Sequence, residues 1–222
     1  MLYAGLRYGA NIKAYYVNTA FQPEFELQDA YKVAEKIGTE ITVIEMEVLN
    51  NEQVTSNPAN RCYYCKMAIF GTLQKQAHAD GFQLIIDGTN ASDDANDRAG
   101  MKALAELSAR SPLRESGITK DEIRRLSKEA GLFTWDKPAY ACLATRIPTG
   151  RTITADLLHR VEKSEDALFK LGFTDFRVRV YDEAARLQFP NEQMIEALNK
   201  KADIKKAIKQ YFKIILLDLE GR

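Results

Sequence analysis

The chain has few side chains that bind transition metals, with only three cysteines and two histidines among its 222 residues. Three cysteines cannot all pair with one another, so a disulfide framework is not what holds this protein together. They cannot supply the four thiolates of a structural zinc site either. They leave a metal site with one open position, or an odd thiol, and an open metal position is a place for chemistry.

Neither sign of charge is in excess, and no apolar run is long. Lysines and arginines number 31, as do aspartates and glutamates, which argues against DNA or another bulk polyanion as an obligatory partner. The sequence has no apolar stretch near the length that a bilayer requires, and no leader of the secretory type. We therefore expect a cytoplasmic protein with reduced thiols, which binds neither nucleic acid nor a membrane.

In the first part of the chain, short apolar runs alternate with amphipathic stretches. We predict strands at 12–17, 41–46 and 84–87, a loop at 49–61, and helices at 23–37, 62–78, 98–107 and 120–130. Thr119 and Glu122 have the spacing of a capping box before the last of these helices. Strands that alternate with helices in this way predict an α/β fold with a parallel sheet covered on both faces.

The rhythm changes after Pro148-Thr149-Gly150. From there we predict helices at 154–171 and 191–210, and strands at 176–181, 186–189 and 213–219. This order predicts a small α+β unit with an antiparallel sheet. The Pro-Gly segment is the expected boundary between two domains, residues 1–148 and residues 149–222.

One loop of the first part is a candidate ligand site. In an open α/β sheet, ligands gather at the carboxyl ends of the strands, and the loop at 87–94 follows the predicted strand at 84–87. Gly88 permits close backbone approach, and polar residues such as Thr89 and Asn90 suit a nucleotide or a metal ion. The alternative is a strand-ending turn whose residues are chosen for turn propensity.

The cysteines form a pair and a distant third. Cys62 and Cys65 stand as a C-x-x-C pair, whereas Cys142 lies far along the chain. Zinc is one metal to consider, with His78 or His159 as the fourth ligand, although neither histidine has the spacing typical of a metal site. The alternative for each cysteine taken singly is a small buried apolar side chain.

Several motifs occur in order along nearly the whole chain. They are Asn57-Pro58, Arg61-Cys62-Tyr63-Tyr64-Cys65-Lys66, Asp87-Gly88-Thr89-Asn90, Arg110-Ser111-Pro112-Leu113, Trp135-Asp136-Lys137-Pro138-Ala139 and Cys142-Leu143-Ala144-Thr145-Arg146-Ile147-Pro148. In these the chain resembles the LarE family, ATP-dependent sulfur transferases of the PP-loop ATP pyrophosphatase superfamily. The resemblance implies a Rossmann-like fold of the adenine-nucleotide alpha hydrolase type. It also implies a role in making the nickel-pincer cofactor from pyridinium-3,5-biscarboxylic acid mononucleotide.

Family members divide by their cysteines. Some have one, matching Cys142, whose sulfur is given up so that the protein is consumed. Others have three and bind an iron–sulfur cluster, and all three positions are cysteine here, at Cys62, Cys65 and Cys142. The resemblance thus implies a [4Fe-4S] cluster with one iron left without a protein ligand, which can hold hydrosulfide from a sulfide donor.

The implied reaction has two steps. ATP with Mg²⁺ adenylates a substrate carboxylate, and the hydrosulfide then attacks the acyl adenylate and expels AMP. The resemblance assigns catalysis to Cys142, Arg146 and Glu165, cofactor binding to Gly88, Thr89 and Asn90, and substrate phosphate binding to Arg177 and Arg179.

The two arginines Arg177 and Arg179 alternate along a predicted strand, so both project from one face and can clamp an anion. Glu165 can orient one of the arginines. The alternative is a solvated strand face with a surface ion pair. Thr145 stands where the family usually has serine, and this change preserves the hydroxyl group.

The sequence departs from the superfamily at one motif. A Ser-Gly-Gly-x-Asp-Ser loop, whose backbone amides grip the pyrophosphate of ATP, does not occur in it. The chain opens at Met1-Leu2-Tyr3-Ala4-Gly5-Leu6, which resembles the middle of the helix that follows that loop. We expect either a fragment of a longer enzyme or a polypeptide that lacks this grip, for which adenylation is in question.

Three other functions follow from the same residues. One is a single donation of the Cys142 sulfur, with Cys62 and Cys65 holding only a structural or regulatory metal. Another is a noncatalytic cluster-binding protein without ATP turnover. The third, thiolation of tRNA by a related PP-loop enzyme, is disfavoured by the balanced charge and the absence of an RNA-binding extension. The resemblance also suggests a homo-oligomer.

Overall fold

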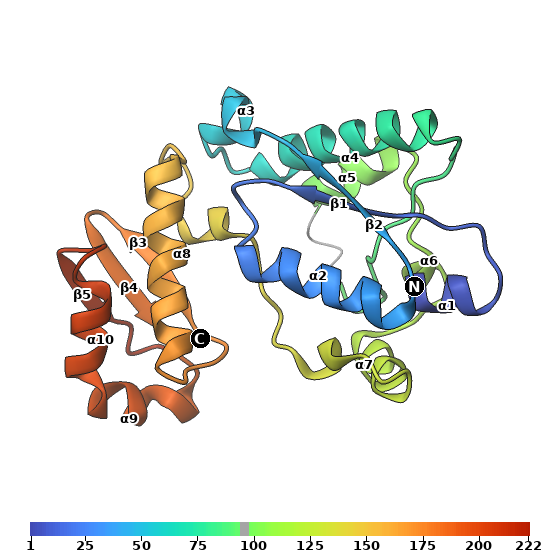
Figure 1. Ribbon diagram of the computed structural model, residues 1–222. Coiled ribbons are helices and arrows are strands. Elements are labelled where there is room, and N and C mark those ends of the chain that lie inside the picture. Colours follow the sequence, from blue (N-terminus) through green and yellow to red (C-terminus); the bar gives the residue numbers. More distant parts are fainter. Residues whose placement is uncertain (94–97) are drawn as a thin grey trace. The chain divides into compact units, whose positions relative to one another are not determined.

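The computed structural model describes residues 1–93 and 98–222, which form two compact units (Figure 1). The first unit comprises Met1–Thr19, Glu24–Val48 and Ala59–Lys137, and the second comprises Ala20–Pro23, Leu49–Pro58 and Pro138–Arg222. The domain division at 148/149 stays a prediction.

The first unit contains the predicted parallel strand pair. Strand β1 (Ala14–Asn18) pairs in parallel with β2 (Ile41–Glu45), and the helix α2 (Glu24–Ile37) connects them. Figure 1 shows the two strands running between α2 and α4 (Arg61–Ala79). The α/β character predicted for this part is confirmed.

The predicted strand at 84–87 is wrong. Only an isolated parallel bridge joins Ile86 to Arg110 there. Its two hydrogen bonds run from the Arg110 N–H to the Ile85 carbonyl and from the Asp87 N–H to the Arg110 carbonyl, both at 2.9 Å. The chain then turns, because the Asp87 carboxylate accepts hydrogen bonds from the Thr89 N–H and hydroxyl. One bridge is too short to form a strand.

The predicted loop at 49–61 is also partly helical. It contains the end of a 3₁₀ turn, η1 (Val48–Asn50), and a short helix, α3 (Glu52–Thr55). Val48 and Val54 are buried and anchor these turns. The sequence pattern missed them because four residues are too few to show a helical period.

Two further helices predicted for the first unit, at 98–107 and 120–130, are confirmed. The capping box is confirmed, because the Thr119 hydroxyl accepts from the Glu122 N–H at 3.3 Å and the Glu122 carboxylate accepts from the Thr119 N–H at 2.8 Å. The helical elements of the first unit not named above are α1 (Leu2–Arg7), α5 (Arg98–Glu106), α6 (Pro112–Glu115), α7 (Lys120–Glu129) and η2 (Phe133–Asp136).

The second unit has a mixed three-stranded sheet. Strand β3 (Arg177–Tyr181) pairs antiparallel with β4 (Ala184–Gln188), but β4 pairs in parallel with β5 (Ile214–Leu217). The predicted antiparallel sheet is therefore confirmed for β3 and β4 but wrong for β5. Helices α9 (Asn191–Asn199) and α10 (Lys201–Ile208) form a crossover between β4 and β5, which returns the chain in the same direction.

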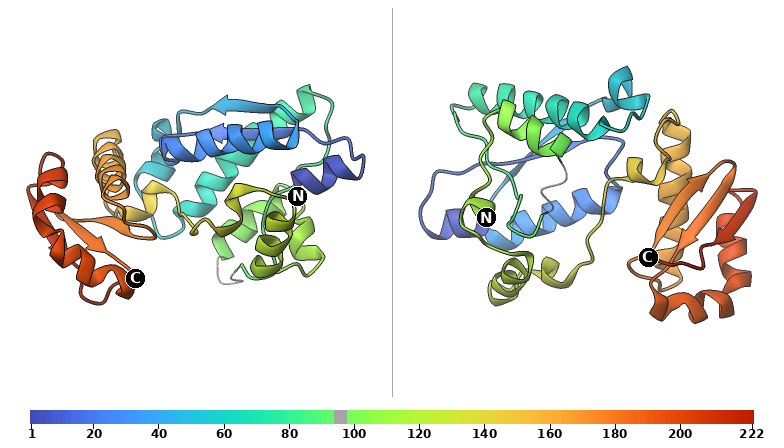
Figure 2. Two further views of the ribbon diagram at one scale, coloured as in Figure 1. Left: turned by 60° about the horizontal axis from the view of Figure 1, so that its bottom comes forward. Right: turned by 180° about the vertical axis from the view of Figure 1, so that it is seen from behind.

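The apolar face of this sheet forms the core of the second unit. Val178, Val180 and Leu187 are buried on that face, where the helix α8 (Ala155–Lys170) packs on β3 and α10 packs on α8. Figure 2 gives two further views of these elements. The opposite face carries the alternate residues of β3, which include Arg177 and Arg179. Among the described residues, no helix is both long and apolar enough to cross a bilayer.

Thr154 caps α8, the helix that carries Glu165, because its hydroxyl accepts a hydrogen bond from the Leu157 N–H at 3.2 Å. We expect Thr154→Ala to lower the free energy of unfolding by about 1 kcal/mol, since the first turn of the helix loses this acceptor. The neighbouring Thr152 is exposed and caps no helix, so Thr152→Ala is the matched control. Urea denaturation measures both variants, and equal effects would contradict the assignment.

Candidate functional site

A buried ion pair lies at the centre of the candidate site in the second unit. Arg146 ends the turn η3 (Leu143–Arg146), and Glu165 lies on α8. The Arg146 Nε donates to Glu165 Oε1 at 2.8 Å, and both side chains are only about 1% exposed. The Val178 N–H donates to the same carboxylate oxygen at 2.9 Å. Glu165 therefore ties η3 and β3 to α8, and its predicted role of orienting an arginine agrees with this contact.

Tyr140 completes this buried pair, and sequence reasoning missed it. Its hydroxyl donates to the Glu165 carboxylate. The guanidinium carbons of Arg146 and Arg177 lie 4.8 Å and 5.3 Å from the centroid of its ring. Burial raises the pKa of Tyr140, and the Glu165 charge raises it further. The only signal in the sequence is an aromatic residue two positions before Cys142, which is too weak to single it out.

Arg177 and Arg179 hold the segment that carries Cys142. The Arg177 guanidinium donates to the Ala139 carbonyl at 2.6 Å, and Arg179 donates to the Thr145 carbonyl at 2.8 Å. These two carbonyls flank Cys142 on either side in the sequence. Arg177 is 5% exposed, so the alternative of a fully solvated strand face does not describe it. We refer to Arg146, Arg177 and Arg179 as the arginine cluster.

Positive charge is in excess around the arginine cluster. Burial lowers the pKa of Arg177 and of Arg179, and the Arg146 charge lowers both further. Arg186 lies directly opposite Arg179 in the β3–β4 ladder and also lowers the pKa of Arg179. The nearby carboxylates are Glu165, Asp218 and Asp175, of which Asp218 lies 3.5 Å from Arg186 and Asp175 lies 3.9 Å from Arg177. Four guanidinium groups against three carboxylates, of which Asp175 also pairs with Arg222, form a surface suited to an anion.

Cys142 lies at the start of η3, and its backbone is fixed from several directions. Its carbonyl accepts from the Thr145 N–H at 3.0 Å and from the Thr145 hydroxyl at 2.8 Å. Thr145 in turn accepts from Arg146 at 2.8 Å, so the hydroxyl preserved at this position links Cys142 to the arginine cluster. The Cys142 side chain is partly exposed, as access for a reactant requires.

Asn57 holds the other end of this segment. It is buried with a positive φ of 53°, and its amide donates to the carbonyls of Ile147 at 3.2 Å and Pro148 at 2.8 Å. Its own carbonyl accepts from the Gly150 N–H at 2.8 Å. Asparagine tolerates this left-handed backbone better than most residues. The motif that contains Asn57 therefore acts here by fixing the chain after η3.

The pair Cys62 and Cys65 lies in the first two turns of α4, in the first unit. Residues three apart on a helix share one face, with Cβ atoms roughly 5–6 Å apart. Arg61 is 6% exposed, and its guanidinium donates to the Cys62 sulfur at 3.7 Å. Metals are bound by the thiolate form of cysteine. Arg61 was not predicted as a site residue.

His78 does not complete a metal site with this pair. It lies near the C-terminal end of the same helix, roughly 20 Å from Cys65 at 1.5 Å of rise per residue. Within either unit, the described residues hold no group of three Cys, His, Asp or Glu side chains arranged to bind a metal. Cys142 belongs to the second unit, whereas Cys62 and Cys65 belong to the first.

The loop after Asp87 uses its polar groups internally. The Thr89 hydroxyl donates to Asp87 at 2.6 Å, and the Asn90 amide donates to Asp93 at 2.8 Å. These contacts are those of a turn, which agrees with the alternative reading of this loop. A Cβ atom added at Gly88 would meet nothing within 4 Å, so the backbone is open there. Nucleotide binding by Gly88, Thr89 and Asn90 stays a prediction, and residue 94 of the loop lies outside the described residues.

Comparison with known proteins gives three relatives. An uncharacterized protein of Synechocystis is 39% identical over 92% of this chain and 77% of its own length. The pyridinium-3,5-bisthiocarboxylic acid mononucleotide synthase of Lactiplantibacillus plantarum is 29% identical over 95% of this chain and 77% of its own. An uncharacterized protein of Methanocaldococcus jannaschii is 29% identical over 92% of this chain and 79% of its own. No protein-family model matches the chain.

We expect Glu165→Gln to lower the free energy of unfolding by about 3–5 kcal/mol, because it leaves the buried Arg146 charge without a counter-ion. Glu162 lies on the same helix and is only partly buried, so Glu162→Gln is the control. Chemical denaturation measures both variants. A loss below about 1 kcal/mol for Glu165→Gln, the range of exposed pairs, would contradict the buried pair.

Tyr140 gives a prediction about pH. Its pKa is raised in the folded protein, so its contribution is complete below the ordinary tyrosine pKa of about 10 and is lost as the pH rises beyond that value. The stability difference between the wild type and Tyr140→Phe should therefore shrink between about pH 9 and pH 11. Tyr181, which is 54% exposed, provides the control Tyr181→Phe. A stability difference between the wild type and Tyr140→Phe that stays constant over this pH range would contradict the raised pKa of Tyr140.

Proposed function

Because the chain belongs to the LarE family, we propose that it is a sulfur transferase of nickel-pincer cofactor biosynthesis. Its substrate in this proposal is pyridinium-3,5-biscarboxylic acid mononucleotide, whose carboxylates it converts to thiocarboxylates with ATP and Mg²⁺. The named relative supports the product, since it is a synthase of the bisthiocarboxylic acid mononucleotide. The structural observation that carries the proposal is the fixing of Cys142 beside a buried, positively charged cluster.

The arginine cluster supports an anionic substrate. A mononucleotide carries a phosphate group, and guanidinium groups hold phosphate through paired, charge-assisted hydrogen bonds. Arg177 and Arg179 donate some of their N–H groups to the carbonyls of Ala139 and Thr145, and these hydrogen bonds fix the orientation of the two guanidinium groups. We assign their remaining N–H groups to the substrate phosphate. An anion would also offset the cost of holding several like charges together.

The three cysteines fit a [4Fe-4S] cluster by the chemistry of their side chains. Cys62 and Cys65 share one helix face, and Arg61 donates to the Cys62 sulfur, so this pair offers two sulfur ligands on the same side of α4. Cys142 provides the third thiolate. When bound, such a cluster has one iron without a protein ligand and supplies hydrosulfide as the sulfur nucleophile.

The remaining groups act on the substrate. A carboxylate resists attack by an anionic sulfur, because its charge repels the nucleophile and oxide is a poor leaving group. Adenylation removes both obstacles, since the acyl adenylate is neutral at the reacting carbon and AMP departs as the C–S bond forms. Arg146 lies four residues after Cys142 and is held by Glu165. In the proposal it stabilises negative charge that develops beside the sulfur.

The first test is metal content. After anaerobic purification, we expect iron and acid-labile sulfide in the wild type, and loss of both in Cys62→Ala, Cys65→Ala and Cys142→Ala, because each removes one of three ligands. His78→Ala and His159→Ala are matched controls and should retain iron. Loss of bound zinc in a histidine variant, with no iron in the wild type, would refute the cluster.

The second test is turnover. With ATP, Mg²⁺, sulfide and the mononucleotide, we expect release of pyrophosphate and AMP and more than one product per protein, with the Cys142 mass unchanged. A single product per protein, with dehydroalanine formed at position 142, would establish sacrificial donation. Absence of pyrophosphate release in the presence of bound iron would establish a noncatalytic cluster protein.

A further inference from the structure

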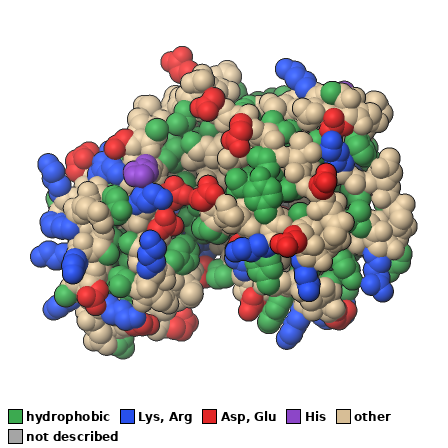
Figure 3. Space-filling model, in the orientation of Figure 1, with side chains coloured by type: hydrophobic (Ala, Val, Ile, Leu, Met, Phe, Trp, Pro, Cys, Tyr) green, Lys and Arg blue, Asp and Glu red, His purple; other side chains and the backbone are tan. Residues whose placement is uncertain are grey.

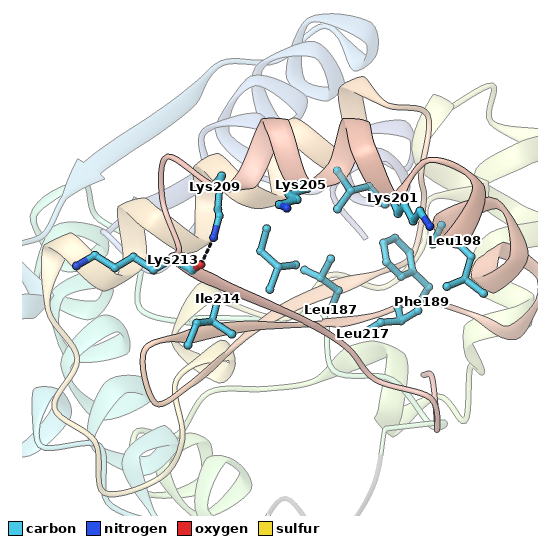
Figure 4. Close-up of a pocket in the computed structure, with 12 residues that line it drawn as sticks. Leu187, Phe189, Leu198, Lys201, Lys205, Lys209, Lys213, Ile214 and Leu217 are labelled. Atoms are coloured by element: carbon cyan, nitrogen blue, oxygen red, sulfur yellow. Dashed lines mark hydrogen bonds between the residues drawn. The ribbon is translucent and has the colours of Figure 1, made fainter.

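A groove of about 520 Å³ lies in the second unit between α10 and β5. Figure 4 shows its lining. Its apolar lining residues include Leu187, Phe189, Ile204, Ile215 and Leu217. The volume falls within the range of roughly 300–1,000 Å³ that is typical of ligand pockets. The groove is separate from the arginine cluster, because neighbouring residues on a strand point to opposite faces, and Leu187 is next to Arg186 on β4.

Four lysines follow the groove along its length. Lys201, Lys205 and Lys209 are spaced four residues apart, so they form a row on one side of α10 about 6 Å apart, and Lys213 precedes β5. Figure 4 shows this row, and Figure 3 shows cationic side chains gathered over α10 and β5. Residues 191–217 contain six lysines and only three acids. In the described part of the chain, none of the four forms an ion pair.

The β5 wall of the groove is an open sheet edge, because β5 pairs only with β4 among the described residues. The Asp218 N–H donates to the Leu187 carbonyl at 2.9 Å, so the even-numbered residues of β5 bond to β4. The main-chain groups of Ile215 and Leu217 therefore point to the open edge. The carbonyl of Lys213, another odd-numbered residue, also bonds away from β4, because it accepts from the Lys209 ammonium.

We propose that the groove and the β5 edge bind an extended acidic segment of a partner protein. Such a segment pairs its main chain with the edge, places apolar side chains in the groove, and directs carboxylates to the lysines. Ile214, which is 54% exposed, lies at the rim where a further apolar residue can pack. A single-headed amphiphile fits less well, because it would engage lysines at one end only and leave the main-chain groups of β5 unpaired.

A labelled peptide tests the proposal on the full chain. The probe is acetyl-Glu-Val-Leu-Glu-Val-Leu-Glu-amide, which carries three acids and large apolar residues, and fluorescence polarisation measures its binding. We expect saturable binding that weakens as salt rises, and a roughly tenfold weaker affinity for Lys205→Glu. Lys206 is exposed on the same helix but does not line the groove. Lys206→Glu is thus a control with the same change in charge, and we expect less than about a twofold effect.

Three results would overturn the proposal. Equal weakening by Lys205→Glu and Lys206→Glu would mean general attraction to a positive surface. Undiminished binding of a peptide N-methylated at alternate residues would exclude pairing with the β5 edge. Displacement of the peptide by dodecyl phosphate, with tighter saturable binding, would make the groove a site for an anionic amphiphile instead. Circular dichroism checks that each variant is folded.

Discussion

The buried pair of Arg146 and Glu165 is the interaction on which the rest of the candidate site depends. Two charges removed from water need close partners, and a missing partner costs several kcal/mol. The Glu165 carboxylate accepts hydrogen bonds from Arg146, the Tyr140 hydroxyl and the Val178 N–H. These donors come from the Cys142 segment and from β3, so the requirement for charge compensation joins both of them to α8.

The same constraint explains why the cluster is prepared for an anion. Burial lowers the pKa of Arg177 and Arg179, so keeping both side chains charged in the folded protein costs free energy. Hydrogen bonds to the Ala139 and Thr145 carbonyls offset part of this cost and fix the guanidinium planes. An incoming phosphate would therefore meet groups already oriented, and would lose little binding energy to rearrangement.

Sequence periodicity predicted the longer helices and the β1–β2 pair, because an apolar face repeats over enough residues to be recognised, but it missed short ones such as α3. It also placed Arg177 and Arg179 on one face of a strand, since strands alternate. It failed at Ile86, where one bridge replaces a strand, and at β5, whose direction depends on a crossover. Tyr140 was missed because its partner Glu165 is distant in the sequence and only the fold brings them together.

The sheet of the second unit separates two kinds of cation. Arginines occupy one face, where planar guanidinium groups can be buried and still donate several directed hydrogen bonds. Lysines border the groove on the other face, where flexible, well-hydrated ammonium groups remain in solvent. Because Leu187 and Arg186 are neighbours on β4 with opposite directions, a segment in the groove would not block the arginine face. Docking of a partner and binding of a small anion can therefore occur together.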